Sequence, residues 1–348
     1  MNVEQLISTV VLSYNIKRPV IALSSPGIGK SSAVYQAARL LGKQFNTDFS
    51  VMEVRAATTN PAELADIKFV VDGIVRDAPQ GWFPTDEAVA EGRFPERGII
   101  FADEIADSTL TVQSALQRLL LDRKLGSLTL AKGWHTVAAS NRQSDKPAAG
   151  RLSTALANRC IVVTVEPDTD CFVKHALEYG FVSDVIAFCR WKPSCWNFDP
   201  ASKNQNPAFC SPRSMEILSD ILKYDPKPHP ELVTGTVGDG IGSEVLGFLE
   251  LKNELPDLNQ ILKDPDSVKI PNRMDVCIAT LYALIGRIED KTVMNIVKYV
   301  ARNQTEIATM AFKDLCKTHP SVLVNKDLRD WMVKPENYKL LSYGYEEN

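Results

Sequence analysis

The stretch Val20-Ile-Ala-Leu-Ser-Ser-Pro-Gly-Ile-Gly-Lys-Ser-Ser32 decides the fold of this chain. Its apolar, β-branched start predicts a strand from Val20 to Leu23, its small residues predict a loop, and an amphipathic helix is expected from Ser31 to Leu41. A loop between a strand and a helix can surround a phosphate chain with backbone N–H groups, and the positive end of the helix dipole faces the same anion. We therefore predict a phosphate-binding loop.

The lysine of such a loop reaches the β- and γ-phosphates, and the hydroxyl after it contacts Mg²⁺. These roles fall to Lys30 and Ser31. The usual motif begins with Gly six residues before the lysine, where this chain has Ser24; because two glycines keep the loop permissive, we expect the change to be tolerated. An ordinary glycine-rich turn is the alternative, which the flanking strand and helix disfavour. The predicted nucleotide-binding residues are Ser25, Pro26, Gly27, Ile28, Gly29, Lys30, Ser31 and Ser32.

Composition narrows the class of protein. With 348 residues there is room for two or three domains, and contents of 45% hydrophobic and 24% charged residues are ordinary for a soluble globular protein. A net charge of −4 gives no global basic field for nucleic acid, so we consider such a partner unlikely. Seven cysteines without framework spacing, no basic N-terminal leader and no long apolar run predict a cytoplasmic protein without a membrane span. Cys189 and Cys195 are interpreted as packing residues, because no His stands at a zinc-ligand spacing.

Residues 1–166 alternate strand-like and helix-like segments, as in a parallel sheet covered by helices. The segment Lys68–Arg97 is too long for a simple crossover, so we predict an inserted hairpin and a mobile loop. Its Trp82-Phe83 pair would either grip a client polypeptide or anchor the insert on the core. Further strands are predicted at Phe49–Ala57, Ile99–Phe101, His135–Ser140 and Cys160–Val165, and helices at Leu110–Leu121 and Leu152–Asn158.

The rest of the chain is predicted to be helical, with a lid over 167–230 and a C-terminal region over 231–348. A second glycine-rich segment, Gly235–Gly242, follows no convincing strand and has no lysine. We therefore predict a flexible connector before a helix near Ser243, rather than a second phosphate site. Lid helices are expected at Asp170–Tyr179, Val182–Trp191 and Pro212–Tyr224.

Polar residues end two of the predicted buried strands. Gly98-Ile-Ile-Phe-Ala-Asp-Glu104 ends in two carboxylates, and transfer of a phosphoryl group to water needs one carboxylate on Mg²⁺ and one group that orients the attacking water. We assign Asp103 to Mg²⁺ and Glu104 to the base or water-positioning role. Asn141 ends another strand, where it could contact the γ-phosphate and the water or could simply be a turn residue.

Two arginines complete the set of candidates. Arg159 stands at a predicted helix end, where a cation is favourable in any case. Ser211 is predicted to be a helix N-cap and Pro212 the first helical residue. Arg213 then lies in the first turn, where its charge opposes the helix dipole. An anionic partner such as the phosphates of ATP would explain a cation at that place.

In this order, Ser-Pro-Gly-Ile-Gly-Lys-Ser, Phe-Ala-Asp-Glu, Ser-Asn, Asn-Arg-Cys and Ser-Pro-Arg resemble the motifs of AAA+ ATPases, specifically the MoxR-like group of bacteria and their phages. The resemblance covers residues 1–225, and the segment Lys68–Arg97 is similar to that group's insert in the second core helix. It implies that Asn141 is the sensor-1 residue, Arg159 the arginine finger and Arg213 the sensor-2 residue. Arg142 departs from the pattern, since many relatives have another residue after the sensor Asn.

The resemblance implies an α/β AAA+ P-loop NTPase core, with a parallel five-stranded sheet flanked by helices, followed by a helical lid and a helical C-terminal region. It implies Mg²⁺-dependent ATP hydrolysis by a homo-oligomeric ring, expected to be a hexamer, that remodels or activates a protein partner in a chaperone-like way. By family likeness alone, that partner could carry a von Willebrand factor A domain. Two alternatives stay open: a DNA- or RNA-directed motor, and a nucleotide-gated structural module with negligible turnover. The predicted catalytic residues are Glu104, Lys30, Asn141, Arg159 and Arg213, and the predicted metal ligands are Ser31 and Asp103.

Overall fold

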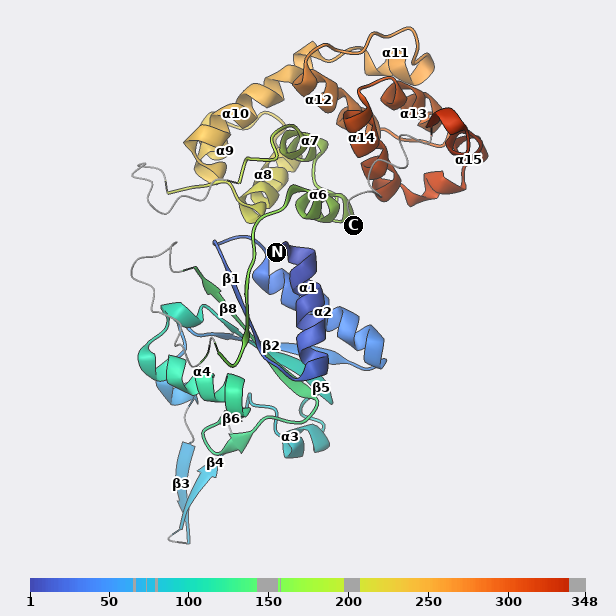
Figure 1. The fold of residues 1–348 in the computed structure, drawn as a ribbon. Coiled ribbons are helices and arrows are strands. Elements are labelled where there is room, and N and C mark those ends of the chain that lie inside the picture. Colours follow the sequence, from blue (N-terminus) through green and yellow to red (C-terminus); the bar gives the residue numbers. More distant parts are fainter. Residues whose placement is uncertain are drawn as a thin grey trace. The chain divides into compact units, whose positions relative to one another are not determined.

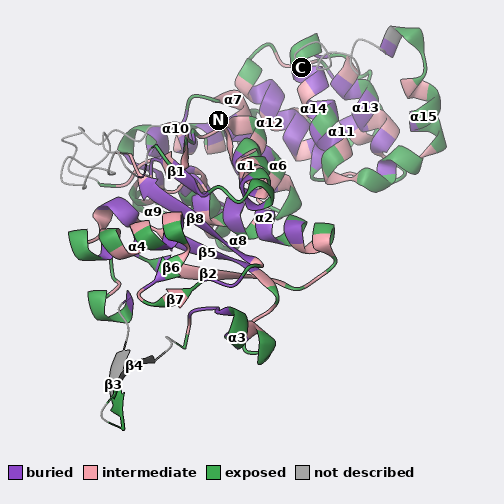
Figure 2. Cartoon of the chain, turned by 60° about the horizontal axis from the view of Figure 1, so that its bottom comes forward, coloured by how far each residue is buried: buried purple, intermediate pink, exposed green. Residues whose placement is uncertain are grey.

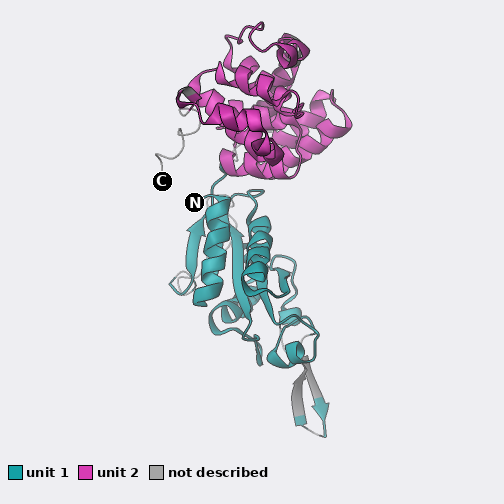
Figure 3. Cartoon of the chain, turned by 90° about the vertical axis from the view of Figure 1, so that its right-hand side faces the viewer, with its two compact units in different colours: residues 1–168, 199–202 teal, residues 169–198, 203–348 magenta. Residues whose placement is uncertain are grey.

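The computed structural model describes residues 1–64, 67–72, 74–78, 81–142, 156, 158–196 and 207–337. The chain divides into two compact units, the first built on residues 1–168 and the second beginning at Thr169 (Figure 3). Within the described residues, no helix is both long and apolar enough to cross a bilayer.

The first unit is built around a five-stranded sheet with the order β2-β5-β8-β1-β9. All neighbouring strands are parallel, so their carboxyl ends lie at one edge; Val20, for example, pairs with Val137 on one side and Ile161 on the other. The strands are β1 (Val20–Ser24), β2 (Phe49–Arg55), β5 (Arg97–Asp103), β8 (Trp134–Asn141) and β9 (Ile161–Thr164). The five strands expected from the sequence are therefore all present.

Helices cover both faces of this sheet (Figure 1). Helices α1 (Val3–Ile16) and α2 (Lys30–Phe45) pack on one face through buried side chains such as Leu6 and Leu41, and α4 (Leu110–Asp122) packs on the other face. Figure 2 shows the buried strands between these partly exposed helices. Helix α1 was not expected from the sequence, although it begins with a capping box in which Asn2 and Gln5 bond each other's backbone N–H.

The insert contains the expected hairpin, formed by β3 (Ile67–Val71) and β4 (Ile74–Ala78), which pair only with each other. It is followed by the short helix α3 (Asp86–Ala90). Phe83 is 1% exposed and belongs to the core, while half-buried Trp82 donates its indole N–H to a backbone carbonyl at 3.3 Å. This geometry favours the anchoring role for the pair. A second small hairpin joins β6 (Lys124–Leu125) to β7 (Leu128–Thr129). Of the predicted helix Leu152–Asn158, all but two residues lie outside the described part.

The second unit is helical around one apolar core. Within it, buried Arg190 donates two hydrogen bonds to the buried carboxylate of Asp314, at 2.9 and 3.0 Å, and also bonds Asp170. Tyr282 donates its hydroxyl to the same Asp314. These contacts tie four helices together, and the buried charges are paired as burial requires. The helices are α6 (Thr169–Glu178), α7 (Ser183–Trp191), α8 (Pro212–Tyr224), α9 (Pro230–Val237), α10 (Asp239–Glu250), α11 (Leu258–Lys263), α12 (Met274–Ile285), α13 (Val293–Ala301), α14 (Thr305–Thr318) and α15 (Lys326–Met332).

The prediction of a flexible connector at Gly235–Gly242 is wrong, because the segment is almost entirely helical. Helix α9 runs through Gly235, and α10 starts directly after Gly238, whose φ of 85° makes the turn. Gly242 lies where the two helices touch: a Cβ there would stand 2.7 Å from the Cα of Thr234. Glycine at this position therefore allows the two helices to pack closely. A glycine-rich sequence alone does not distinguish such packing from a flexible loop.

Candidate functional site

Lys30 is the central side chain at the carboxyl edge of the sheet. It is 9% exposed, and its Nζ lies 2.8 Å from Ser24 Oγ, 3.4 Å from the carbonyl oxygens of Ser24 and Ser25, and 3.5 Å from Asn141 Oδ1. These four contacts hold the end of the lysine side chain against the loop and against the end of β8. An anion placed against the loop would meet the positive charge of Lys30 directly.

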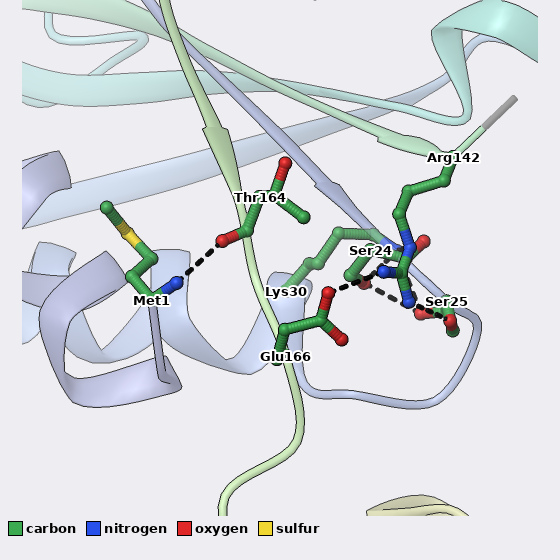
Figure 4. A network of polar contacts seen from close by, with 7 residues as sticks. All are labelled: Met1, Ser24, Ser25, Lys30, Arg142, Thr164 and Glu166. Carbon is green, nitrogen blue, oxygen red and sulfur yellow. Dashed lines mark hydrogen bonds and ion pairs between the residues drawn. The ribbon is translucent and has the colours of Figure 1, made fainter. Parts of the chain in front are cut away.

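Ser24 explains why the loop tolerates a departure from the usual glycine. It is the last residue of β1, paired with Asn141 of β8, and its backbone stays in the strand. Its hydroxyl accepts a hydrogen bond from Lys30 and donates one to the Ser25 carbonyl at 2.7 Å (Figure 4). Because the position needs no positive φ, a side chain costs nothing there, and this one orients the lysine.

The loop turns at its two glycines, where the backbone requires them. Gly27 and Gly29 have φ angles of 77° and 105°, a region that side chains rarely adopt. Helix α2 begins directly afterwards at Lys30, and Gly29, its N-cap residue, provides no side-chain cap for the first N–H groups. Those N–H groups and the helix dipole face the loop, as the sequence predicts for a phosphate site.

The carboxylates of β5 reach the same edge. Ser31 donates its hydroxyl to Asp103 at 3.3 Å, so the two predicted metal ligands meet. Asp103 also accepts the backbone N–H of Glu104 at 2.9 Å. Glu104 has a φ of 57°, and a left-handed conformation at a residue other than glycine costs about 1–2 kcal/mol. Strain of this kind clusters at functional sites, so it supports a role for the Glu104 side chain.

Asn141 joins the two sides of the site. Its amide oxygen faces Lys30, and its amide nitrogen donates to Asp107 at 3.3 Å. Asp107 lies in the short 3₁₀ turn after Glu104, and the sequence analysis did not identify it. These two partners fix the orientation of the amide, since the reverse assignment would put N–H groups against a cation.

Arg142, the other departure from the family pattern, also contacts the loop. Its guanidinium donates to Ser25 Oγ and pairs with Glu166, which follows β9 (Figure 4). At the end of β9, the amino group of Met1 donates a hydrogen bond to the Thr164 carbonyl at 2.8 Å. These contacts connect the phosphate loop to β8 and β9, the two strands next to β1. The role of Arg142 could not be read from the sequence, because its pairing with Glu166 depends on the order of the strands.

Arg55 is a further cation that the sequence analysis missed. In the register of β2 and β5 it stands opposite Asp103. The pKa of Arg55 is raised, first by its hydrogen bond to Glu53 and more weakly by the carboxylates of Asp103 and Glu104. The strand order could have revealed it, because the end of β2 must lie next to the end of β5.

Arg159 lies at the opposite edge of the sheet. Ile161, two residues later, donates its N–H to the carbonyl of Pro19, directly before β1. Five residues of strand at about 3.3 Å each therefore separate that edge from the end of β1, so Arg159 does not join its own phosphate loop. The structure brings together Lys30, Ser31, Asp103, Glu104 and Asn141, and it leaves Arg159 apart.

Arg213 belongs to the second unit, at the start of α8. Its local setting agrees with the prediction: Ser211 is the N-cap of α8, bonded reciprocally with Ser214, and Pro212 is the first helical residue. The Arg213 side chain is exposed in the first turn.

The donor set fits a magnesium ion better than a metal held by protein alone. Among the described residues, no group of three or more His, Cys, Asp or Glu side chains is placed to hold a metal. Mg²⁺ in nucleotide sites commonly takes one or two protein ligands and completes its shell with phosphate oxygens and water. The hydroxyl of Ser31 and the carboxylate of Asp103 provide such a pair.

No protein-family model and no curated protein matches the sequence. Among solved structures, the replication initiator DnaA bound to AMPPCP and single-stranded DNA is 14% identical, with 97% of this chain and 93% of that chain covered and a TM-score of 0.37. A RuvB mutant of Thermotoga maritima is 13% identical (99% and 88% covered, TM-score 0.32), and C. elegans PCH-2 is 11% identical (86% and 70% covered, TM-score 0.33). With TM-scores this low, the fold assignment rests on the sheet itself. A parallel five-stranded sheet flanked by helices, with a phosphate loop after β1 and a helical region beyond it, confirms the predicted fold class.

Proposed function

We propose that this chain is an AAA+ ATPase that hydrolyses ATP with Mg²⁺. One observation carries the proposal: the ends of β1, β5 and β8 bring a loop lysine, a hydroxyl–carboxylate pair, a strained glutamate and an amide to one edge of the sheet. Parallel α/β sheets bind ligands at this edge. The set contains the groups that bind the phosphates, hold Mg²⁺ and activate the attacking water.

Each of these side chains has a definite task. Lys30 binds the β- and γ-phosphates, while the loop N–H groups surround the chain of phosphates. Ser31 and Asp103 would hold Mg²⁺, which supplies charge neutralisation on the phosphate oxygens. Glu104 accepts a proton from the attacking water, and Asn141 orients that water and the γ-phosphate. Phosphoryl transfer depends mainly on such positioning and on electrostatic stabilisation.

The arginine finger must come from another copy of the chain. Because Arg159 lies at the far edge of the sheet, it can complete a nucleotide site only on a neighbouring subunit. This supports a ring, which the MoxR-like resemblance suggests is hexameric. We propose remodelling of a protein partner as the output of the ring, with a von Willebrand factor A domain protein as one candidate partner.

Two substitutions test the ATPase function. Lys30→Ala should abolish nucleotide binding, because it removes a charge-assisted phosphate contact. Glu104→Gln should bind ATP and retain it, because it keeps the shape and removes the base. Binding by equilibrium titration and phosphate release over time distinguish these two losses, and Glu87→Gln, on exposed α3, is the matched control. A Glu104→Gln protein that hydrolyses ATP at the wild-type rate would refute the assigned base.

The tip of the insert hairpin is the better candidate for contact with the client. Val70 is 68% exposed and Ile74 is 58% exposed, whereas Phe83 is buried. Exposed apolar side chains on a hairpin suit contact with a polypeptide. Val70→Ser with Ile74→Ser should leave melting and basal ATP hydrolysis unchanged and prevent co-purification of client with the ATP-loaded Glu104→Gln protein. Equal client capture by the variant would contradict this role, and Val324→Ser, at an exposed position of the second unit, is the control.

A further inference from the structure

A cavity lies at the amino ends of β1 and β9, the edge of the sheet opposite the phosphate loop. It has a volume of about 600 Å³, within the range of small-molecule sites. Four cationic side chains line it, namely Lys17, Arg18, Arg123 and Arg159, against a single carboxylate, Asp122. His135 also lines it and adds no charge near neutral pH, because burial lowers its pKa to about 3.

Three of these cations have no carboxylate partner among the residues that the structure describes. Arg123 donates to the carbonyls of Trp134 and Ala131, at 3.0 and 2.8 Å, so its guanidinium is satisfied within the fold. Lys17 instead places its Nζ over the Tyr14 ring, 3.9 Å from the centroid. In the described part of the chain, no ion pair joins the side chain of Lys17, Arg18 or Arg159 to an acid, and all three residues are exposed.

The cations that line the cavity outnumber its carboxylate and repel one another. The pKa of Lys17 is lowered, first by the partial burial of its otherwise exposed side chain and then by repulsion from Arg123 and Arg97. Helices α1 and α4 end here, and their carbonyl ends favour cations, which accounts for Lys17 and Arg123 at their C-caps. The attraction of cations to a helix end does not account for Arg18, which lies beyond the C-cap of α1. A concave site with several converging cations concentrates field lines and attracts anions.

We propose that this cavity is a second phosphate-binding site, which takes the polyphosphate of a nucleotide through Lys17 and Arg18 beside Arg159. The nucleotide can come from solution, or it can be bound in the phosphate loop of an adjacent copy. Binding of a neighbour's nucleotide rests on the shared-site mechanism proposed above, whereas binding of a nucleotide from solution does not. In the second case Arg18 acts on the neighbour's phosphates together with the arginine finger.

The first arm measures binding from solution. Tripolyphosphate is titrated by calorimetry into Lys30→Ala protein, in which the phosphate loop no longer binds, at a concentration where sedimentation shows a monomer. Binding from solution predicts that Arg18→Gln or Lys17→Gln weakens the affinity about tenfold, as expected for a charged hydrogen bond. Asp122→Asn should strengthen it, because it removes the one negative charge. Lys43→Gln, an exposed position on α2 away from the cavity, should leave it unchanged.

The second arm measures action on a neighbour. Subunits with Arg159→Ala are mixed with subunits carrying Lys30→Ala, so that an intact loop meets an intact Arg159, and ATP hydrolysis is recorded. Adding Arg18→Gln to the Lys30→Ala subunit should reduce the recovered rate about tenfold, whereas adding it to the Arg159→Ala subunit should have no effect. If the parent mixture recovers no activity, the shared-site mechanism fails and the first arm alone decides. Two results together overturn the second site. Tripolyphosphate does not bind, and the mixture recovers its full rate of ATP hydrolysis whichever subunit carries Arg18→Gln.

Discussion

His135 shows how a single buried base can set the acid stability of the first unit. It is the second residue of strand β8, is 2% exposed, and its Nε2 lies 3.2 Å from the Ser13 hydroxyl of helix α1. Burial, followed by the charges of Lys17 and Arg123, lowers its pKa to about 3. The neutral ring is therefore part of the packing between α1 and the sheet.

A pH dependence of stability follows from this shift. Between pH 6.5 and about 3 the unfolded chain binds a proton at His135 that the folded chain does not bind. Stability should therefore be full above the unfolded pKa and fall as the pH falls, by at most about 1.4 kcal/mol per pH unit from this group. Denaturant unfolding of the first unit across this range measures the slope. His135→Gln should flatten it and His229→Gln, at the exposed start of α9, should not. Identical slopes in wild type and His135→Gln would contradict the assignment.

Single residues were predictable from the sequence where their role follows from a short motif at the end of a strand. Lys30, Ser31 and Asp103 each follow directly from a strand ending in a motif, and the structure brings them together. Arg55 and Asp107 were missed because their proximity depends on which strands are neighbours and how the chain turns after β5. The positive φ of Glu104 likewise comes from the tertiary structure, since glutamate has no local preference for it.

Among the elements, the strands and most helices were predictable, because buried parallel strands appear as short apolar runs and helices show a 3.6-residue period. Helix α8 agrees with its predicted bounds, since Ser211 and Pro212 mark its start in the sequence. Helix α9 and the first turn of α10 were missed because glycines suggested a loop, whereas the helix expected near Ser243 is the rest of α10. The apolar positions Val233, Val237 and Ile241 carried the helical pattern and are buried.

Substitution of two glycines in α10 tests that correction. Gly242→Ala should destabilise the second unit by about 1–3 kcal/mol, because its Cβ would stand 2.7 Å from the Thr234 backbone and push the helices apart. Gly247→Ala, in the same helix but exposed and with nothing within 4 Å of its Cβ, should instead stabilise by about 0.5–1 kcal/mol. Thermal unfolding of both variants gives the comparison. If the segment were a flexible connector, both substitutions would change the stability of the second unit by small amounts of the same sign.

For the whole molecule, the sequence could predict an α/β core followed by helices, and the family resemblance suggested that Arg159 acts on a neighbour's nucleotide. The structure supplies one constraint: Arg159 and the phosphate loop occupy opposite edges of one sheet. The distance is fixed by the length of strands β1 and β9, which are paired residue by residue. Small rearrangements of side chains cannot close it, so a single subunit cannot use its own Arg159 on its own nucleotide.

Mixed assemblies test this consequence. Arg159→Ala subunits should bind ATP normally and lose about 10³–10⁵ in hydrolysis rate, the contribution of an arginine finger to charge stabilisation in the transition state. Lys30→Ala subunits should be inactive because they bind no nucleotide. When the two are mixed, an intact Lys30 on one subunit can meet an intact Arg159 on the next, so phosphate release should recover in part and rise with the fraction of mixed contacts. Lys30→Ala mixed with an Arg159→Ala, Glu104→Gln double variant is the control and should stay inactive, because its only intact loop then lacks the base. If assemblies shown to be mixed recover nothing, the shared site is refuted, and the nucleotide-gated module with negligible turnover becomes the better description.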